Sequence, residues 1–209
     1  MIKIVIADDH QLIREGLKRV IQRETDFELI AETDNPLKVI ELVQTKEFDV
    51  LILDINFPQK SGFEVLKEVK LIKPQSRILM LSIHPEERYA LRTLKAGASG
   101  YLNKDCEPEE LLNAIRTISV GKKYITPSIG DRLLSSKDNS LENPLEILSD
   151  REFEVLRLIA EGKNQTEIAE MLSLGVSTVN TYRSRILEKL ELKSDSEIVC
   201  FAMEKNLID

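Results

Sequence analysis

Residues 2–10 have the sequence IKIVIADDH, and this short stretch decides how the first half of the chain folds. Five of its first six residues are apolar and most are β-branched, which predicts a buried β-strand. Asp8 and Asp9 follow the strand directly, and from Leu12 to Ile21 apolar residues recur at helical spacing. A buried strand that ends in charged residues and leads into a helix is typical of an α/β fold.

The same alternation returns four more times before residue 120. Further strands are predicted at 27–31, 50–53, 78–81 and 100–103, with helices following them at 37–43, 63–69, 86–95 and 108–118. Five strands that alternate with five helices predict a parallel sheet with helices on both faces. Because the strands are apolar almost throughout, we expect both faces of the sheet to be covered.

The composition changes twice after this region. Residues 121–144 contain two prolines, two glycines and a polar run at 135–140, which predicts a linker with one helical turn near 129–134. From residue 145 to residue 209 the sequence has four helical segments and no strand pattern. The two middle helices are joined by a short turn at Leu174-Gly175, which predicts a helix-turn-helix. We therefore expect two domains, 1–120 and 145–209, joined by a linker at 121–144.

The composition excludes several classes of protein. Hydrophobic residues make up 42% and charged residues 31% of the chain, a globular balance that excludes disordered and fibrous proteins. Two cysteines are too few for a disulfide framework. No apolar run approaches the ~20 residues of a membrane-spanning helix, and we see no signal peptide. We expect a soluble, cytoplasmic protein without a membrane partner.

Polar residues follow four of the predicted strands: Asp8 and Asp9, then Asp54, Ser82 and Lys104. The carboxyl ends of parallel strands meet at one edge of a sheet, so these side chains are expected to converge. Three carboxylates repel one another unless a cation joins them, and their oxygens suit Mg²⁺. A lysine and a hydroxyl at the same place favour a bound phosphate, and a carboxylate can accept a phosphoryl group covalently. The sequence therefore predicts magnesium-assisted phosphorylation of Asp54.

Ordinary structural roles exist for some of these residues. Asp8 or Asp9 could simply cap the helix that follows. His84, two residues after Ser82, is interpreted as a loop residue without a catalytic role; the alternative is that it flanks a phosphoryl group together with Asn56.

The whole pattern resembles the receiver domain of two-component response regulators over residues 1–120. The residues that carry the resemblance are Asp8-Asp9-His10, the run from Asp54 to Pro58 with Gly62, then Ser82, Tyr101 and Lys104. The resemblance implies a flavodoxin-like, doubly wound sheet of five parallel strands in the order 2-1-3-4-5. It also implies that a sensor histidine kinase phosphorylates Asp54.

The receiver resemblance further implies a role for each site residue. Asp9 and Asp54 are expected to bind Mg²⁺ directly, Asp8 through water, and Asn56 through its backbone carbonyl. Ser82 is expected to hold a phosphoryl oxygen, and Lys104 is expected to pair with it. Tyr101 resembles the aromatic switch residue that turns inward when the hydroxyl moves.

The second domain resembles the LuxR-type helix-turn-helix domain of the NarL/FixJ family over residues 145–209. The motifs that carry this resemblance lie at 148–152, 165–169, 177–183 and 187–190. The resemblance implies an all-α domain of four helices, in which Val176–Leu190 is the recognition helix in the major groove of DNA.

The charge pattern limits how this domain can hold DNA. The chain has a net charge of −7, and residues 145–209 hold 8 basic and 13 acidic residues, so DNA binding needs a local basic stripe. Residues 177–193 supply one, with four basic and two acidic residues. Short polar side chains are expected to reach base edges and basic ones to contact phosphates. The predicted DNA-binding residues are Ser177, Asn180, Thr181, Arg183, Ser184, Arg185 and Lys189.

The combined prediction is a bacterial transcription factor of a two-component system. Phosphorylation of Asp54 is expected to favour a homodimer that binds double-stranded DNA at promoter half-sites, and the only reaction expected is slow hydrolysis of its own aspartyl-phosphate. One alternative is a constitutive DNA-binding regulator whose receiver only dimerises. The other is a magnesium phosphatase, which needs a second carboxylate as general acid, whereas Asn56 stands two residues after Asp54.

Overall fold

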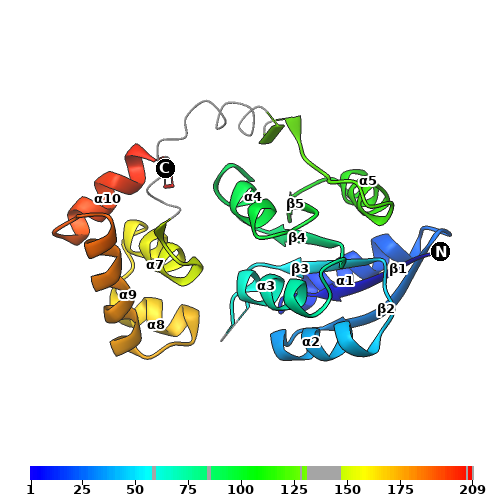
Figure 1. The fold of residues 1–209 in the computed structure, drawn as a ribbon, viewed down its shortest axis with the longest axis horizontal. Coiled ribbons are helices and arrows are strands. Elements are labelled where there is room, and N and C mark those ends of the chain that lie inside the picture. The colour runs from blue at the N-terminus through cyan, green and yellow to red at the C-terminus, as the bar shows by residue number, and fades with distance from the viewer. Residues whose placement is uncertain (58–59, 84–85, 128, 131–146, 206, 209) are drawn as a thin grey trace. The chain divides into compact units, whose positions relative to one another are not determined.

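The computed structural model describes residues 1–57, 60–83, 86–127, 129–130, 147–205 and 207–208 (Figure 1). The chain divides into two compact units, Met1–Asp138 and Asn139–Asp209. Within the described residues, no helix is both long and apolar enough to cross a membrane.

The first unit is built on one parallel sheet. Its strands are β1 (Ile2–Ala7), β2 (Phe27–Thr33), β3 (Val50–Asp54), β4 (Ile78–Ser82) and β5 (Gly100–Asn103). They lie in the order β2-β1-β3-β4-β5, and every neighbouring pair is parallel. The predicted α/β class and strand order are therefore confirmed, with strand ends that differ by at most two residues from the predicted ones.

Helices cover both faces of this sheet (Figure 1). They are α1 (Gln11–Gln22), α2 (Pro36–Thr45), α3 (Gly62–Ile72), α4 (Glu86–Lys95) and α5 (Pro108–Ser119). Leu17 and Ile21 of α1 share one buried cluster with Ile115 and Ile118 of α5 and with Ile4 of β1. Because side chains alternate along a strand, the residues between those of this cluster point to the other face, where they are also buried.

The parallel arrangement brings the carboxyl ends of all five strands together at one edge of the sheet. Asp8 continues β1, and its N–H donates to the carbonyl of Thr33 at the end of β2 (3.1 Å). Asp54 is the last residue of β3 and pairs with Leu81 of β4. The N–H of Lys104, just after β5, donates to the carbonyl of Ser82 (2.7 Å). These backbone contacts thus fix the positions from which the side chains of Asp8, Asp54 and Lys104 extend.

Helix α3 approaches the end of β3 unusually closely, through Gly62. Its N-terminus has a capping box between Ser61 and Glu64, and the N–H of Gly62 donates to the carbonyl of Ile55 (2.7 Å). A Cβ atom on Gly62 would lie 2.0 Å from the backbone oxygen of Asp54. Only glycine allows this contact, which holds the chain that follows Asp54.

The second unit contains α7 (Asp150–Ala160), α8 (Gln165–Leu172), α9 (Val176–Lys189) and α10 (Asp195–Glu204). Ser149 and Asn164 form capping boxes at α7 and α8, and Ser194 caps α10. Helix α9 packs against both α7 and α8, and α10 packs on α7. The predicted four-helix arrangement is confirmed, with α9 ending one residue earlier than expected.

Part of the predicted linker at 121–144 is described. The N–H of Tyr124 donates to the carbonyl of Ser99 (2.9 Å), and Tyr124 forms an isolated parallel bridge with Gly100 of β5. The chain therefore runs along β5 after it leaves α5. The helical turn predicted near 129–134 lies outside the described residues except for 129–130, and His84 lies outside them altogether.

We expect Gly62→Ala to lower the free energy of unfolding by about 1–3 kcal/mol or more, because the new Cβ collides with backbone. Gly16→Ala is the matched control: Gly16 lies inside α1, and a Cβ atom added there would meet nothing within 4 Å, so the change should raise stability by about 0.5–1 kcal/mol. Urea denaturation followed by circular dichroism measures both. Equal stability of the Gly62→Ala variant and the wild type would contradict the close approach.

Candidate functional site

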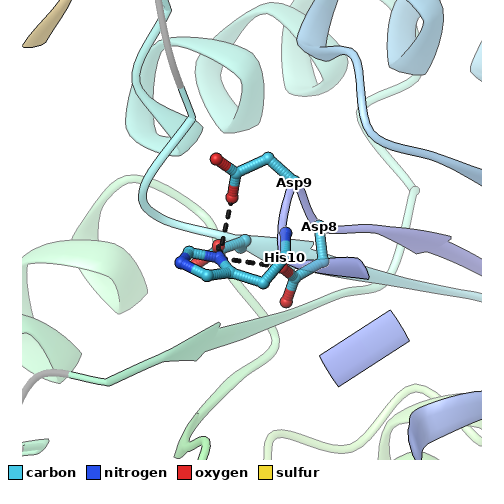
Figure 2. Close-up of side chains that lie close together, drawn as sticks. Asp8, Asp9 and His10 are labelled. Atoms are coloured by element: carbon cyan, nitrogen blue, oxygen red, sulfur yellow. Dashed lines mark hydrogen bonds and ion pairs between the residues drawn. The ribbon is translucent and has the colours of Figure 1, made fainter. Parts of the chain in front are cut away.

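Side chains from the ends of β1 and β3 converge on one acidic pocket. Figure 2 shows His10 turned toward Asp8 and Asp9. His10 Nδ1 lies 2.8 Å from Asp9 Oδ1, 3.2 Å from Asp8 Oδ1 and 3.5 Å from Asp54 Oδ2. The structure therefore brings the three predicted carboxylates together and adds His10, which the sequence reasoning used as part of a motif without giving it a role.

Lys104 lies on another side of the same pocket. Its Nζ lies 2.7 Å from Asp54 Oδ2 and 2.8 Å from Asp8 Oδ2, and its side chain is only 2% exposed. A buried ammonium between two buried carboxylates balances charge that would otherwise be costly to bury. Lys104 is thus where the sequence placed it, within hydrogen-bond distance of the predicted phosphoacceptor.

Asp54 is 1% exposed. The pKa of its carboxyl group is raised to about 6, chiefly by burial and also by the Asp8 carboxylate, although Lys104 and the N–H of Asn56 act in the opposite direction. That N–H donates to Asp54 Oδ1 (3.2 Å). Water has little access to Asp54, whose charge depends on the groups around it.

Ser82 and Tyr101 are both buried. Ser82 ends β4 one residue beyond Leu81, the partner of Asp54, and Tyr101 pairs with Met80 from the middle of β5. The structure thus places the predicted hydroxyl next to the end of β3 and the predicted aromatic residue on the strand that leads into Lys104.

The pocket has the donor set of a small divalent cation. Asp8, Asp9, His10 and Asp54 each offer one ligand atom, and the four atoms lie within 4.8 Å of one another. Asp8 Oδ2 and Asp9 Oδ1 are buried, and each lies 2.8 Å from a nitrogen: Asp8 Oδ2 from Lys104 Nζ and Asp9 Oδ1 from His10 Nδ1. Carboxylate oxygens are the hard ligands that Mg²⁺ prefers, so these residues fit the predicted ion.

In the second unit, α9 presents an exposed polar face. Its buried residues are Val179 and Ile186, and a hollow on the helix is lined by Ser177, Thr178, Thr181, Tyr182 and Arg185. Asn180 and Ser184 are exposed as well. Among the residues of this exposed face, the predicted DNA-binding set lacks only Thr178 and Tyr182. They lie three residues before Thr181 and Arg185, a spacing that places them on the same face of the helix.

The three basic residues predicted to contact DNA differ in their surroundings. Arg183 Nε lies 2.6 Å from Asp195 Oδ1 of α10, and Lys189 Nζ lies 2.6 Å from Glu152 Oε2 of α7. Arg185 is exposed and forms no ion pair with any residue that the structure describes.

Glu152 takes part in two structural contacts at once. Its Oε2 accepts the N–H of Ser149 (2.7 Å) in the capping box of α7 and also pairs with Lys189. Burial alone would raise the pKa of its carboxyl group, but the hydrogen bonds from Lys189 and Ser149 outweigh it and lower the pKa below its ordinary value. Lys189 therefore ties the end of α9 to the start of α7.

Two family descriptions match the chain. "Response regulator receiver domain" matches residues 4–116, which is more than half of the chain, and "Bacterial regulatory proteins, luxR family" matches residues 146–202. The chain belongs to the response regulators. It joins a receiver domain to a LuxR-type DNA-binding domain, as the resemblance implied, and the family consists of regulators rather than enzymes.

Relatives of known name agree with this assignment. Oxygen regulatory protein NreC of Staphylococcus carnosus is 36% identical over 99% of both chains. Transcriptional regulatory protein DegU of Brevibacillus brevis is 35% identical over 95% of this chain and 91% of its own.

Solved structures show the same architecture. A LuxR-family response regulator from Aurantimonas sp. SI85-9A1 has 29% identity and a TM-score of 0.60, covering 65% of this chain and 97% of that chain. The response regulator RcsB of Salmonella typhimurium has 25% identity and a TM-score of 0.59, covering 97% and 98%. One structure of two RcsB dimers bound to two parallel DNAs has 25% identity and a TM-score of 0.59, covering 97% and 98%.

Asp54→Asn is expected to stabilise the fold at neutral pH. The carboxyl pKa of about 6 lies above the ordinary value of 3.8, so the folded chain holds this proton more tightly than the unfolded chain and loses stability as the pH rises through that interval. Asparagine mimics the protonated form, and the variant should gain about 2–3 kcal/mol above about pH 7 and almost nothing below about pH 4. Urea denaturation in the presence of a chelator measures the difference.

Glu41→Gln is the control for this experiment, because Glu41 is an exposed carboxylate on α2. Its difference from the wild type should stay small and constant with pH. An equally constant difference for Asp54→Asn would show that the burial of Asp54 costs nothing.

Arg185→Ala and Lys189→Ala are expected to have different effects, because Arg185 is predicted to contact a DNA phosphate whereas Lys189 pairs with Glu152 inside the domain. Arg185→Ala should weaken binding to specific and random duplexes alike and flatten the salt dependence of affinity by about one unit. Lys189→Ala should lower the free energy of unfolding by up to about 1 kcal/mol, because it breaks the pair with Glu152, and should change the salt dependence less. Salt titrations and urea denaturation of both variants test this, and equal changes in salt dependence would refute the distinction.

Proposed function

We propose that this response regulator accepts a phosphoryl group on Asp54 from a sensor histidine kinase, with Mg²⁺ in the acidic pocket. The observation that carries the proposal is the convergence on Asp54: its Oδ2 lies 2.7 Å from Lys104 Nζ, and its carboxylate belongs to the cluster that fits a divalent cation. The name of the relative DegU, a transcriptional regulatory protein, supports a role in transcription, and NreC is named as a regulatory protein.

Each pocket residue has a place in this proposal. Asp9 and Asp54 hold the ion directly, Asp8 holds it through water, and the backbone carbonyl of Asn56 completes the set. Bound there, the ion neutralises the negative charge that the carboxylates and the incoming phosphoryl oxygens bring together. Asp54 is the nucleophile, and its burial protects the acyl phosphate from water.

Lys104 and Ser82 act on the phosphoryl oxygens. Lys104 exchanges its contact with the Asp54 carboxylate for a contact with the phosphoryl group, which carries more negative charge. Ser82, at the end of β4, donates a hydrogen bond from its hydroxyl group to a phosphoryl oxygen. Tyr101 is buried on the neighbouring strand, and its side chain turns inward when that hydroxyl moves.

Helix α9 is the proposed reader of promoter DNA. Ser177, Asn180, Thr181 and Ser184 present short polar groups at the exposed face, where they reach base edges. Arg185 contacts a phosphate. Arg183 and Lys189 contact phosphates through the N–H donors that their ion pairs with Asp195 and Glu152 leave available. This function requires a protein of the bacterial cytoplasm, where promoter DNA lies.

The proposed domain limits are 1–120 for the receiver, 121–144 for the linker and 145–209 for the DNA-binding domain. A domain of net acidic charge binds DNA weakly as a single copy, so we propose a homodimer on two half-sites. The existence of DNA-bound dimers of RcsB supports this stoichiometry.

Phosphorylation is tested with a small phosphodonor and Mg²⁺, followed by intact-mass measurement. The wild type should gain one phosphoryl group, and Asp54→Asn should gain none. Asp9→Ala should also remain unlabelled, because it loses a metal ligand. Labelling of Asp54→Asn at the rate of the wild type would refute the assignment of the phosphoacceptor, and normal labelling of Asp9→Ala would refute the metal site.

The constitutive alternative predicts a different outcome in the same samples. If phosphorylation controls the protein, sedimentation should show more dimer after labelling, and DNA affinity should rise, since a switch requires states that differ in affinity. Unchanged sedimentation and unchanged affinity after full labelling would support a receiver that acts only as a dimerisation module.

A further inference from the structure

The side chain of His10 is not explained by helix capping. His10 is the N-cap residue of α1 but makes no side-chain hydrogen bond to the helix. Ser, Thr, Asp and Asn are the residues that usually serve this purpose. The imidazole turns back toward the carboxylates instead (Figure 2), so its contacts there need another explanation.

The position of the imidazole nitrogen matches that of a ligand atom. In a six-coordinate site with bonds of about 2.0–2.2 Å, neighbouring ligand atoms lie about 3 Å apart. His10 Nδ1 lies 2.8 Å, 3.2 Å and 3.5 Å from oxygens of Asp9, Asp8 and Asp54. It therefore lies at the spacing of a neighbouring ligand atom from Asp9 and Asp54, the two carboxylates proposed to bind the ion directly.

The backbone holds this corner in place. The N–H of His10 donates to Asp8 Oδ1 (2.8 Å), and Arg14 Nη1 donates to the backbone oxygen of Asp8 (2.7 Å). The imidazole itself is half exposed, which leaves room for water or phosphoryl oxygens at other coordination positions.

We propose that His10 Nδ1 is a further ligand of the acidic pocket and gives it a preference for divalent first-row transition ions over Mg²⁺. This inference rests on the metal site of the proposed function and adds its specificity. Mg²⁺ prefers oxygen ligands only, whereas Fe²⁺ and Co²⁺ also bind imidazole well. Mg²⁺ still binds through the carboxylates, but it gains little from the nitrogen.

The competing explanation is that His10 only balances the charge of the three carboxylates. In that case a bound ion displaces the imidazole, and removal of His10 leaves the affinity for every divalent ion unchanged or higher. The two explanations therefore predict opposite effects of one substitution.

The test uses the full chain. His10→Asn removes the imidazole and keeps a good N-cap residue. By calorimetry, Co²⁺ affinity should fall about tenfold or more, and Mg²⁺ affinity should change less than about threefold. With Mn²⁺ bound, pulsed electron paramagnetic resonance should detect a nitrogen hyperfine coupling in the wild type that His10→Asn lacks.

The chain has two histidines, and His84→Asn is the matched control that should keep the coupling. Loss of the nitrogen coupling in His84→Asn would overturn the role of His10. The absence of that coupling in a wild type that binds the ions would do the same, and neither result would overturn the metal site. Asp9→Asn should weaken all three ions together. A wild type that binds neither Co²⁺ nor Mg²⁺ would instead overturn the metal site itself, and with it the proposed function.

Discussion

The first unit depends on the buried ammonium of Lys104 between two buried carboxylates. Asp8 and Asp54 come from different strands, and each would repel the other if no cation lay between them. Lys104 lies 2.8 Å from one and 2.7 Å from the other. The raised pKa of Asp54 shows that this compensation is incomplete, because burial still disfavours its charge. Additional positive charge in the pocket would therefore stabilise the ionised form of Asp54.

Ion pairs serve a different purpose in the second unit. Lys189 pairs with Glu152 and Arg183 pairs with Asp195, so α9 is tied at two points to α7 and α10. Residues that look like a basic stripe in the sequence therefore also orient the helix that carries them. The acidic partners explain part of the negative charge of this domain: some of its carboxylates position α9, the proposed recognition helix.

The sequence predicted most of the fold because its signals are local. Strand β1 and the capping box at Ser149 can be recognised within a few neighbouring residues, and the structure has both. The convergence of Asp8, Asp54 and Lys104 was predictable because parallel strands end at one edge. The partner of Lys189 was not, since Glu152 lies on another helix and only three-dimensional packing brings the two together. The direction of the His10 side chain was equally hidden, because a helix N-cap and a pocket ligand occupy the same sequence position.

The isolated bridge between Tyr124 and Gly100 connects the acidic pocket mechanically to the chain that leaves the receiver. Gly100 begins the strand on which Tyr101 lies, and Lys104 follows the same strand directly. The departing chain is thus fastened to the element that enters the pocket. A shift of β5 would therefore move the first residues of the connection to the DNA-binding unit. The phosphorylation that we propose at Asp54 thus has a path out of the domain, through the ion pair with Lys104 and the bridge between Gly100 and Tyr124, that needs no contact with the second unit.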